Sequence, residues 1–271
     1  MYLSNRSGLN GATTAPDRSH QPRRTPFRNR VLALLPASSL AHLAPHLEPV
    51  SIRARQTLAE AGLPVRAAHF IERGAACLLS RKVGAQAPME LGIIGRSGFV
   101  GLPIVLGDGR QPYQCVVQIP GRALRIEAGA LRDAYERDPA LRRAMNCHAL
   151  ARLVEQAQLG VCNSRHTVEQ RICRWLLLAG DHVDGASVPA THDLIARMLG
   201  ARRAGVTVAL GGLERAGVLR KGRGRIEILD EEALSAVACD CHRLIRAEGE
   251  RLFTSLAATR GGTADCVRLP L

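Results

Sequence analysis

A dense group of cationic side chains lies between positions 197 and 225 of the sequence. The eight arginines and lysines of this segment accompany a single acidic residue, Glu214, which leaves a local charge of +7. Guanidinium groups at this density bind phosphate oxygens, and an arginine can also contact a guanine edge through two hydrogen bonds. The segment therefore predicts a surface for a polyanion, with an unpartnered, solvated basic face as the alternative. The cations are Arg197, Arg202, Arg203, Arg215, Arg220, Lys221, Arg223 and Arg225.

The elements that must position these cations follow the pattern of two helices joined by a tight turn. Thr191 is a typical N-cap for a helix that runs to residue 199, Gly200 suits the turn, and a second helix is expected over residues 202–216. Residues 219–228 then alternate around Gly222 and Gly224, as in a β-hairpin. We therefore expect a helix-turn-helix followed by a basic wing.

Sequence motifs of catalysis are not found. The chain has no G-x-S-x-G elbow, P-loop or metal-ligand triplet, and the glycine-rich residues 95–98 do not open a helix. The eight cysteines form no C-x-x-C pair, and the close pair Cys239 and Cys241 has only His242 beside it. We expect structural thiols there, with a redox or metal role as the alternative. The sequence thus predicts no enzyme activity, no metal and no cofactor.

The composition is that of an ordinary globular protein with a basic bias. The 271 residues are 46% hydrophobic and 23% charged, with a formal charge of +13 and an isoelectric point near 10.4. No apolar run approaches the roughly 18 residues of a membrane span, and no secretory signal pattern opens the chain. We therefore expect a soluble cytoplasmic protein without a membrane partner.

Glycine-punctuated segments over residues 51–126 predict the short strands of an antiparallel sandwich or roll, with Arg73 and Gly74 forming a hairpin turn. Residues 139–161 keep helical spacing and predict a helix more than about 30 Å long. Its surplus apolar edge suggests a dimer interface, although packing on its own roll is the alternative. The candidate interface residues are Leu141, Met145, His148 and Leu153.

These patterns divide the chain into five regions. They are a disordered basic leader (1–30), a β-roll effector-type domain (31–127), helices that include the long one (128–162), the winged helix-turn-helix domain (163–253) and a flexible tail (254–271).

Residues 191–207 and 223–230 resemble the helix-turn-helix and wing of the Crp/Fnr family of bacterial transcription regulators, and the resemblance extends over residues 31–253. It implies an α+β fold: an N-terminal cyclic-nucleotide-binding-like β-roll, or double-stranded jelly roll, then a long dimerisation helix and a C-terminal winged helix-turn-helix. It also implies a homodimer that binds a near-palindromic operator in double-stranded DNA. RNA polymerase is the further partner expected.

The family's recognition helix reads bases through an arginine, an adjacent glutamate and a later arginine. Matched from Gly200, Arg203 takes the first position, whereas Ala204 and Val208 stand in the other two. The resemblance therefore implies a different operator from that of the best-known members. The expected DNA contacts are Thr191, Ala201, Arg202, Arg203, Thr207, Val208, Arg220, Lys221, Arg223 and Arg225.

Cyclic-nucleotide binders of this family carry a Gly-Glu pair for the ribose and a later Arg-Ser pair for the phosphate. Here Leu102 follows Gly101, and no arginine stands between Arg110 and the next strand. A cyclic phosphate would be buried without a counter-charge, so we expect a sensor domain that does not bind cyclic AMP. The effector is unknown, and the candidate pocket residues are Gly101, Leu102, Arg110, Gln114 and Cys115.

The family's N-terminal iron–sulfur cluster needs cysteines that this chain lacks before Cys77, so no such cluster is expected. The alternative function is a small-molecule-sensing or protein-interaction module whose winged domain has lost specific DNA binding.

Overall fold

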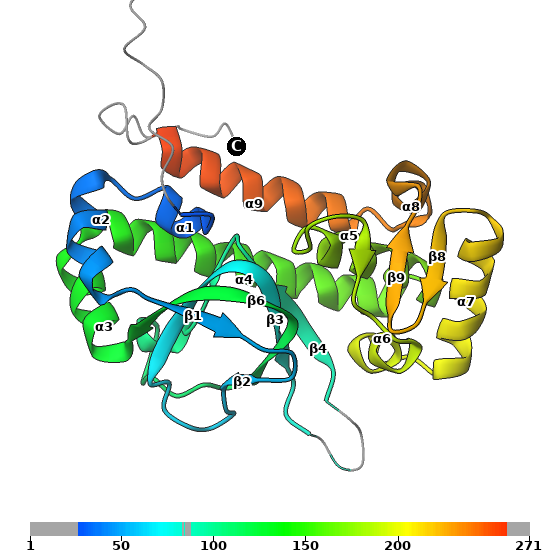
Figure 1. The fold of residues 1–271 in the computed structure, drawn as a ribbon, viewed down its shortest axis with the longest axis horizontal. Coiled ribbons are helices and arrows are strands. Elements are labelled where there is room, and N and C mark those ends of the chain that lie inside the picture. The colour runs from blue at the N-terminus through cyan, green and yellow to red at the C-terminus, as the bar shows by residue number, and fades with distance from the viewer. Residues whose placement is uncertain (1–26, 83, 85–87, 259–271) are drawn as a thin grey trace, which may run out of the picture.

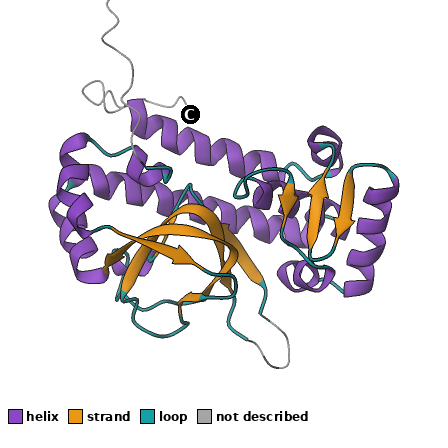
Figure 2. Ribbon diagram, viewed as in Figure 1, coloured by secondary structure: helices purple, strands orange, loops and turns teal. Residues whose placement is uncertain are grey.

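The computed structural model describes residues 27–82, 84 and 88–258, and these residues form a β-roll and a helix-rich C-terminal domain. Two long helices run side by side along the molecule and connect the two parts (Figure 1). Short helices lie at the end of the roll that is away from the C-terminal domain (Figure 2). A small three-stranded sheet lies among the helices of the C-terminal domain. The α+β fold expected from the sequence is confirmed.

The roll is one antiparallel sheet in the order β1-β6-β3-β4, to which β2 adds beside β6 and β5 beside β3. Its inward side chains, among them Phe70, Phe99 and Ile126, are fully buried and fill the interior with apolar groups. The strands are β1 (Glu48–Ile52), β2 (Thr57–Ala59), β3 (Ala67–Leu79), β4 (Glu90–Ile94), β5 (Phe99–Val100) and β6 (Gln114–Glu127).

The predicted hairpin turn at Arg73 and Gly74 is wrong, because β3 passes through these residues as one long strand paired with β6 on both sides. The strand bends there instead. Gly74 has φ +85°, and a Cβ on Gly121 of β6 would collide with the carbonyl of Arg73. Two glycines thus allow the close backbone approach at which both long strands turn the corner of the roll.

The sequence predicts a disordered leader that ends at residue 30, but the structure places Asn29 and Arg30 within the fold. Asn29 is fully buried, donates hydrogen bonds to the carbonyls of Ile71 (2.9 Å) and Gly98 (2.7 Å), and caps α1 (Arg30–Ala33). Residues 1–26 of that predicted leader lie outside the described part. The remaining elements around the roll are α2 (Ala37–Leu43), η1 (Ala44–His46), η2 (Leu102–Ile104) and α3 (Ala128–Arg137).

The two long helices are α4 (Pro139–Arg165) and α9 (Cys241–Ala258), and they pack against each other. Helix α4 continues through Gly160 and past the predicted domain boundary at residue 162. The flexible tail predicted from residue 254 is also wrong up to Ala258, because Phe253 is buried against the roll core and α9 continues beyond it. Residues 259–271 lie outside the described part.

The C-terminal domain shares its core with the roll. Trp175 and Leu176 of α5 pack in one cluster with Ala75, Cys77 and Ile93 of the roll. The indole Nε1 of Trp175 also donates to Glu90 of β4 at 2.9 Å. The elements are α5 (Val168–Gly180), β7 (Ser187–Val188), α6 (His192–Leu199), α7 (Arg203–Arg215), β8 (Leu219–Gly222), β9 (Arg225–Ile228) and α8 (Glu231–Val237).

No helix in the described part of the chain is both long and apolar enough to cross a membrane.

Candidate functional site

The predicted helix-turn-helix is formed by α6 and α7 as the sequence indicates. Thr191 caps α6 by accepting a hydrogen bond from the Leu194 N–H at 3.1 Å. Gly200 ends α6 in the left-handed region, with φ +57° and ψ +36°, which a residue with a Cβ adopts at a cost. Helix α7 then starts at Arg203, one residue after the predicted start, and lies at the outer end of the molecule (Figure 1).

Helix α7 presents one apolar face to the protein and a mixed face to solvent. Val206 and Leu210 are fully buried against α5 and α6, whereas Arg203, Thr207 and Val208 are exposed. Val208 is 73% exposed although it is apolar. The exposed face therefore offers a guanidinium, a hydroxyl and a methyl-bearing surface, which are groups that contact base edges in a major groove.

Two polar contacts hold this exposed face to α6. The Arg203 Nε lies 3.2 Å from the Asp193 carboxylate, and His192 Nδ1 lies 3.0 Å from the Thr207 hydroxyl. The side chains of Arg203 and Asp193 are both more than half exposed, so water screens their attraction and Arg203 can exchange this partner at low cost. Arg202 precedes the helix as its N-cap residue and is exposed.

The hairpin β8–β9 forms the predicted wing. Arg220 pairs with Glu227 across the hairpin at 2.9 Å, and Lys221 reaches Glu214 at the end of α7 at 2.8 Å. Hydrogen bonds from Lys221 hold the pKa of the Glu214 carboxyl below its usual range. Arg223 and Arg225 are exposed, and no acidic side chain in the described part lies within ion-pair distance of either.

The predicted DNA-contacting residues therefore lie on one structural unit, although their surroundings differ. Ala201 is half-buried in the turn, which lies next to Met89 from the segment that leads into β4. A surface hollow lies beside this turn, and Arg197 of α6 lines it together with Ala201 and Arg203. The sequence did not predict Arg197 as a DNA contact. Its signal in the sequence was only its place in the basic segment.

The candidate effector residues do not form a charged pocket. Cys115 is fully buried in the apolar core, where burial raises the pKa of its thiol to about 12. Gln114 donates to Glu60 at 3.1 Å, and the exposed Arg110 donates to the Gly62 carbonyl at 3.3 Å. Leu102 packs against the apolar core of the roll.

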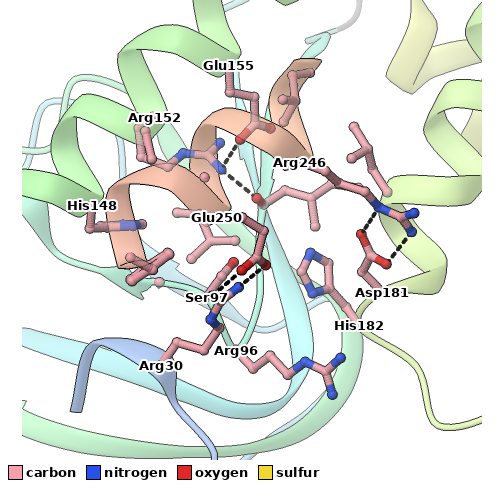
Figure 3. A pocket seen from close by; sticks show the side chains of 18 residues that line it. Arg30, Arg96, Ser97, His148, Arg152, Glu155, Asp181, His182, Arg246 and Glu250 are labelled. Atoms are coloured by element: carbon pink, nitrogen blue, oxygen red, sulfur yellow. Dashed lines mark hydrogen bonds and ion pairs between the residues drawn. The ribbon is translucent and has the colours of Figure 1, made fainter. Parts of the chain in front are cut away.

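A cavity of about 270 Å³ lies elsewhere, between β4, α4, α5 and α9. Figure 3 shows its charged residues in ion pairs: Arg30 with Glu250 and Arg246 with Asp181 join different elements, whereas Arg152 pairs with Glu155 within α4. Arg30 of α1 reaches Glu250 of α9 through two hydrogen bonds of 2.5 and 2.7 Å. The Arg30 and Arg246 pairs therefore attach α9 to α1 beside the roll on one side and to the end of α5 on the other.

The buried His148 and the half-buried His182 line the same cavity. Burial lowers the pKa of His148 to about 3 and that of His182 to about 4, so both rings are neutral at physiological pH. His148 packs on the Phe99 ring with centroids 5.0 Å apart. His182 Nδ1 is buried and has no hydrogen-bond partner among the described residues.

Three of the four predicted dimer-interface residues are used inside the protomer. Leu141, Met145 and His148 are at most 3% exposed, because they lie on the side of α4 that packs on the roll. At about 100° per residue, Leu150 and Val161 lie on the opposite side of the helix. Leu150, Leu153 and Val161 are 44%, 66% and 48% exposed. Helical spacing indicates an apolar face, but it does not say which surface that face buries.

Comparison with protein-family models gives two matches in the order that the structure suggests. Residues 49–138, from β1 to the end of α3, match the cyclic nucleotide-binding domain. Residues 170–237, from α5 to the end of α8, match the Crp-like helix-turn-helix domain. Both α4 and α9 lie entirely outside the two matches. Among curated proteins, no sequence matches the chain significantly.

Solved structures share the fold. FixK2 from Bradyrhizobium japonicum is 15% identical, with a TM-score of 0.62 over 71% of this chain and 98% of its own. A CRP/FNR family transcriptional regulator from Thermus thermophilus is 24% identical, with a TM-score of 0.58 over 70% and 98%. The c-di-GMP responsive global regulator CLP of Xanthomonas campestris is 16% identical, with a TM-score of 0.58 over 71% and 99%. With both domains present in sequence and the fold in place, the chain belongs to the Crp/Fnr family of DNA-binding transcription regulators.

Proposed function

We propose that the protein acts in the cytoplasm as a homodimer that binds a near-palindromic DNA operator and controls transcription there. The observation that carries the proposal is the exposed start of α7, where Arg202 and Arg203 stand at the helix N-terminus beside the basic wing. A helix N-terminus adds free backbone N–H groups to the guanidinium charges, and both suit the phosphates that flank a major groove.

In this proposal Arg203 reads a base and the neighbouring cations hold the backbone. Its guanidinium is exposed and held only by the screened contact with Asp193, so it is free to form a bidentate contact with a guanine. Thr207 and Val208 lie on the same exposed face, and Val208 suits a thymine methyl. Arg223 and Arg225 of the wing suit phosphates beside the groove.

The second copy packs along α4. Leu150, Leu153 and Val161 form an exposed apolar stripe on the side of the helix that faces away from the roll. Two α4 helices joined along this stripe would relate two copies of α7 by a twofold axis. A family dimer of this kind places its recognition helices in successive major grooves, about 34–36 Å apart. RNA polymerase is the further partner in this proposal.

We propose further that the roll does not bind cyclic AMP. The position that would hold a ribose hydroxyl is occupied by the apolar Leu102, and no arginine follows Arg110 before the next strand, where Cys115 is a buried thiol. A phosphate placed there would lose its hydration without gaining a charged partner. Titration calorimetry with cyclic AMP and cyclic GMP is expected to show no binding, and saturable heat from either nucleotide contradicts this part of the proposal.

Selection of genomic DNA fragments by the purified protein at physiological salt tests the function, because that salt suppresses non-specific phosphate binding. A twofold-symmetric site should be enriched. Arg203→Ala should then weaken operator binding by about 10- to 100-fold and relax the preference at one position per half-site.

Arg215→Ala is the matched control, since Arg215 is exposed at the far end of the same helix. It should bind the operator like the wild type. Equal binding by wild type and Arg203→Ala would refute the proposed role of Arg203. A wild type that enriches no site, alone or with cell extract, favours a sensing or protein-interaction module.

A further inference from the structure

Four side chains with metal-binding atoms meet where the long helices join the C-terminal domain. They are Cys162, His166, Cys239 and Cys241, and we call them the junction cluster. Their ligand atoms all lie within 4.8 Å of one another. The three cysteines are at most 4% exposed, and together they form a small buried cluster of their own.

The chain brings these residues together from two distant segments. Cys162 and His166 are four residues apart at the C-terminal end of α4, so they lie on one helix face. Cys239 lies in the short link between α8 and α9, and Cys241, two residues later, is the first residue of α9. The sequence shows only the second pair, because 72 residues lie between His166 and Cys239.

The spacing of the ligand atoms fits a single tetrahedral ion. A zinc ion with Zn–S near 2.3 Å and Zn–N near 2.0–2.1 Å sets sulfur atoms about 3.8 Å apart and sulfur and nitrogen about 3.6 Å apart. Here Cys162 Sγ lies 3.5 Å from Cys239 Sγ, and Cys241 Sγ lies 3.5 Å from His166 Nδ1. In a [2Fe–2S] or [4Fe–4S] cluster the four protein ligands are distributed over two or four iron atoms, so the complete set is spaced more widely than around a single ion.

The surroundings supply positive charge and a hydrogen-bond donor to the sulfur atoms. Arg171 and Arg174 of α5 are buried, and both interact electrostatically with Cys162. The Nε atoms of both arginines lack a hydrogen-bond partner among the described residues. Gln158 donates to Cys241 Sγ at 3.1 Å. A zinc ion bound by three thiolates and one imidazole carries a charge of −1, which two buried guanidinium groups would stabilise.

His242, the ligand that the sequence offered beside the cysteine pair, is engaged elsewhere. Its ring contacts the Cys239 carbonyl at 2.9 Å and the Ser235 hydroxyl at 3.1 Å, which fixes the link between α8 and α9. The His166 ring is half-buried and directs Nδ1 towards Cys241. His166 is therefore the histidine that completes a Cys₃His set.

We propose that the junction cluster binds one Zn²⁺ ion as a closed structural site. Three thiolates and an imidazole in tetrahedral arrangement are a donor set that zinc prefers, and four protein ligands leave no open position for a substrate. Binding displaces the three thiol protons to solvent, and no redox change occurs. The site joins the end of α4 to the start of α9, and so it fixes the hinge that orients the helix-turn-helix.

All four ligands lie outside the residues matched by either domain model, which span 49–138 and 170–237. The site is therefore a property of this chain's junction and does not depend on the proposed DNA-binding specificity.

The first measurement is the metal content of the full-length protein, purified under reducing conditions without chelators. We expect about one zinc per chain. Replacement by Co²⁺ should give the visible ligand-field bands of a tetrahedral site and a thiolate charge-transfer band in the ultraviolet. Both measurements use the wild type, so they do not depend on whether a variant folds.

The variants Cys239→Ser and His166→Asn should lose the bound zinc and lower the melting temperature. Cys147→Ser is the matched control, because Cys147 also lies on α4 but is not part of the junction cluster, and it should keep both. Three results overturn the proposal: no zinc and no Co²⁺ spectrum in the reduced wild type, stoichiometric iron with sulfide, or full metal content in both ligand variants. A Cys162–Cys239 disulfide in protein purified with reductant, seen as a loss of two hydrogens by mass spectrometry, also overturns it.

Discussion

Replacement of His148 by glutamine should flatten the dependence of stability on pH. The ring is 3% exposed, packs on Phe99 and accepts a weak hydrogen bond from the Phe99 N–H at 3.5 Å. Burial, with a smaller contribution from nearby Arg152, lowers its pKa from 6.5 to about 3. Glutamine keeps an acceptor for the same N–H but does not titrate in this range.

The sign follows from proton binding in the two states. Between pH 6.5 and 3 the unfolded chain binds a proton on His148 that the folded protein does not bind. The wild type therefore loses stability as the pH falls through this range. At about 1.4 kcal/mol per pH unit, the loss from this one residue reaches roughly 2 kcal/mol at pH 5.

Urea unfolding at pH 7 and pH 5 measures the effect. The free energy of unfolding should decrease from pH 7 to pH 5 in both proteins, and the decrease should be about 2 kcal/mol smaller in His148→Gln than in the wild type. His46→Gln, at an exposed histidine, should behave like the wild type. If His148→Gln loses as much unfolding free energy between pH 7 and pH 5 as the wild type does, His148 is not the buried neutral group that the structure indicates.

Three further substitutions test the packing. Gly211→Ala should raise the free energy of unfolding by about 1 kcal/mol, because a Cβ there meets open space in the middle of α7; urea unfolding checks this. Gly200→Ala should lower the melting temperature, since φ is +57° and its Cβ would lie 2.5 Å from Met89 Cε. Leu153→Glu on α4 should shift the protein from dimer to monomer in analytical ultracentrifugation. Leu63→Glu, which changes an exposed leucine of the roll, should leave the dimer intact. A dimer that survives Leu153→Glu contradicts the α4 interface.

Local signals were sufficient to predict the helix-turn-helix. Thr191 and Gly200 perform their functions through hydrogen bonds and a backbone angle within a few residues, and both are visible in a single sequence. The wing could be predicted for the same reason, because its turn glycines and alternation are local. In the roll, the sequence marked Gly74 correctly as a special position. The sequence could not distinguish a bend in a long strand from a hairpin, because the bend depends on the close approach of Gly121, which lies 47 residues later in the chain.

The predictions that failed depend on which distant surface an element meets. The apolar residues of α4 were identified, but the roll covers Leu141 and Met145 while Leu153 stays exposed. His166 was not identified as a candidate ligand because its partners in the junction cluster are far away in sequence. Spacing along one helix gives the direction of a side chain, whereas the partner comes only from the packed structure.

Helix α9 changes how a signal can reach the helix-turn-helix. Arg30 stacks on Phe253 at 4.5 Å and pairs with Glu250, while Arg246 pairs with Asp181 at the end of α5. Helix α9 therefore contacts both the roll and the C-terminal domain, which already share one apolar core. A rotation of the C-terminal domain about the end of α4 must break these contacts or carry α9 with it. Because the junction cluster lies at that same point, the cluster, α9 and the shared core act as a single restraint on the orientation of α7.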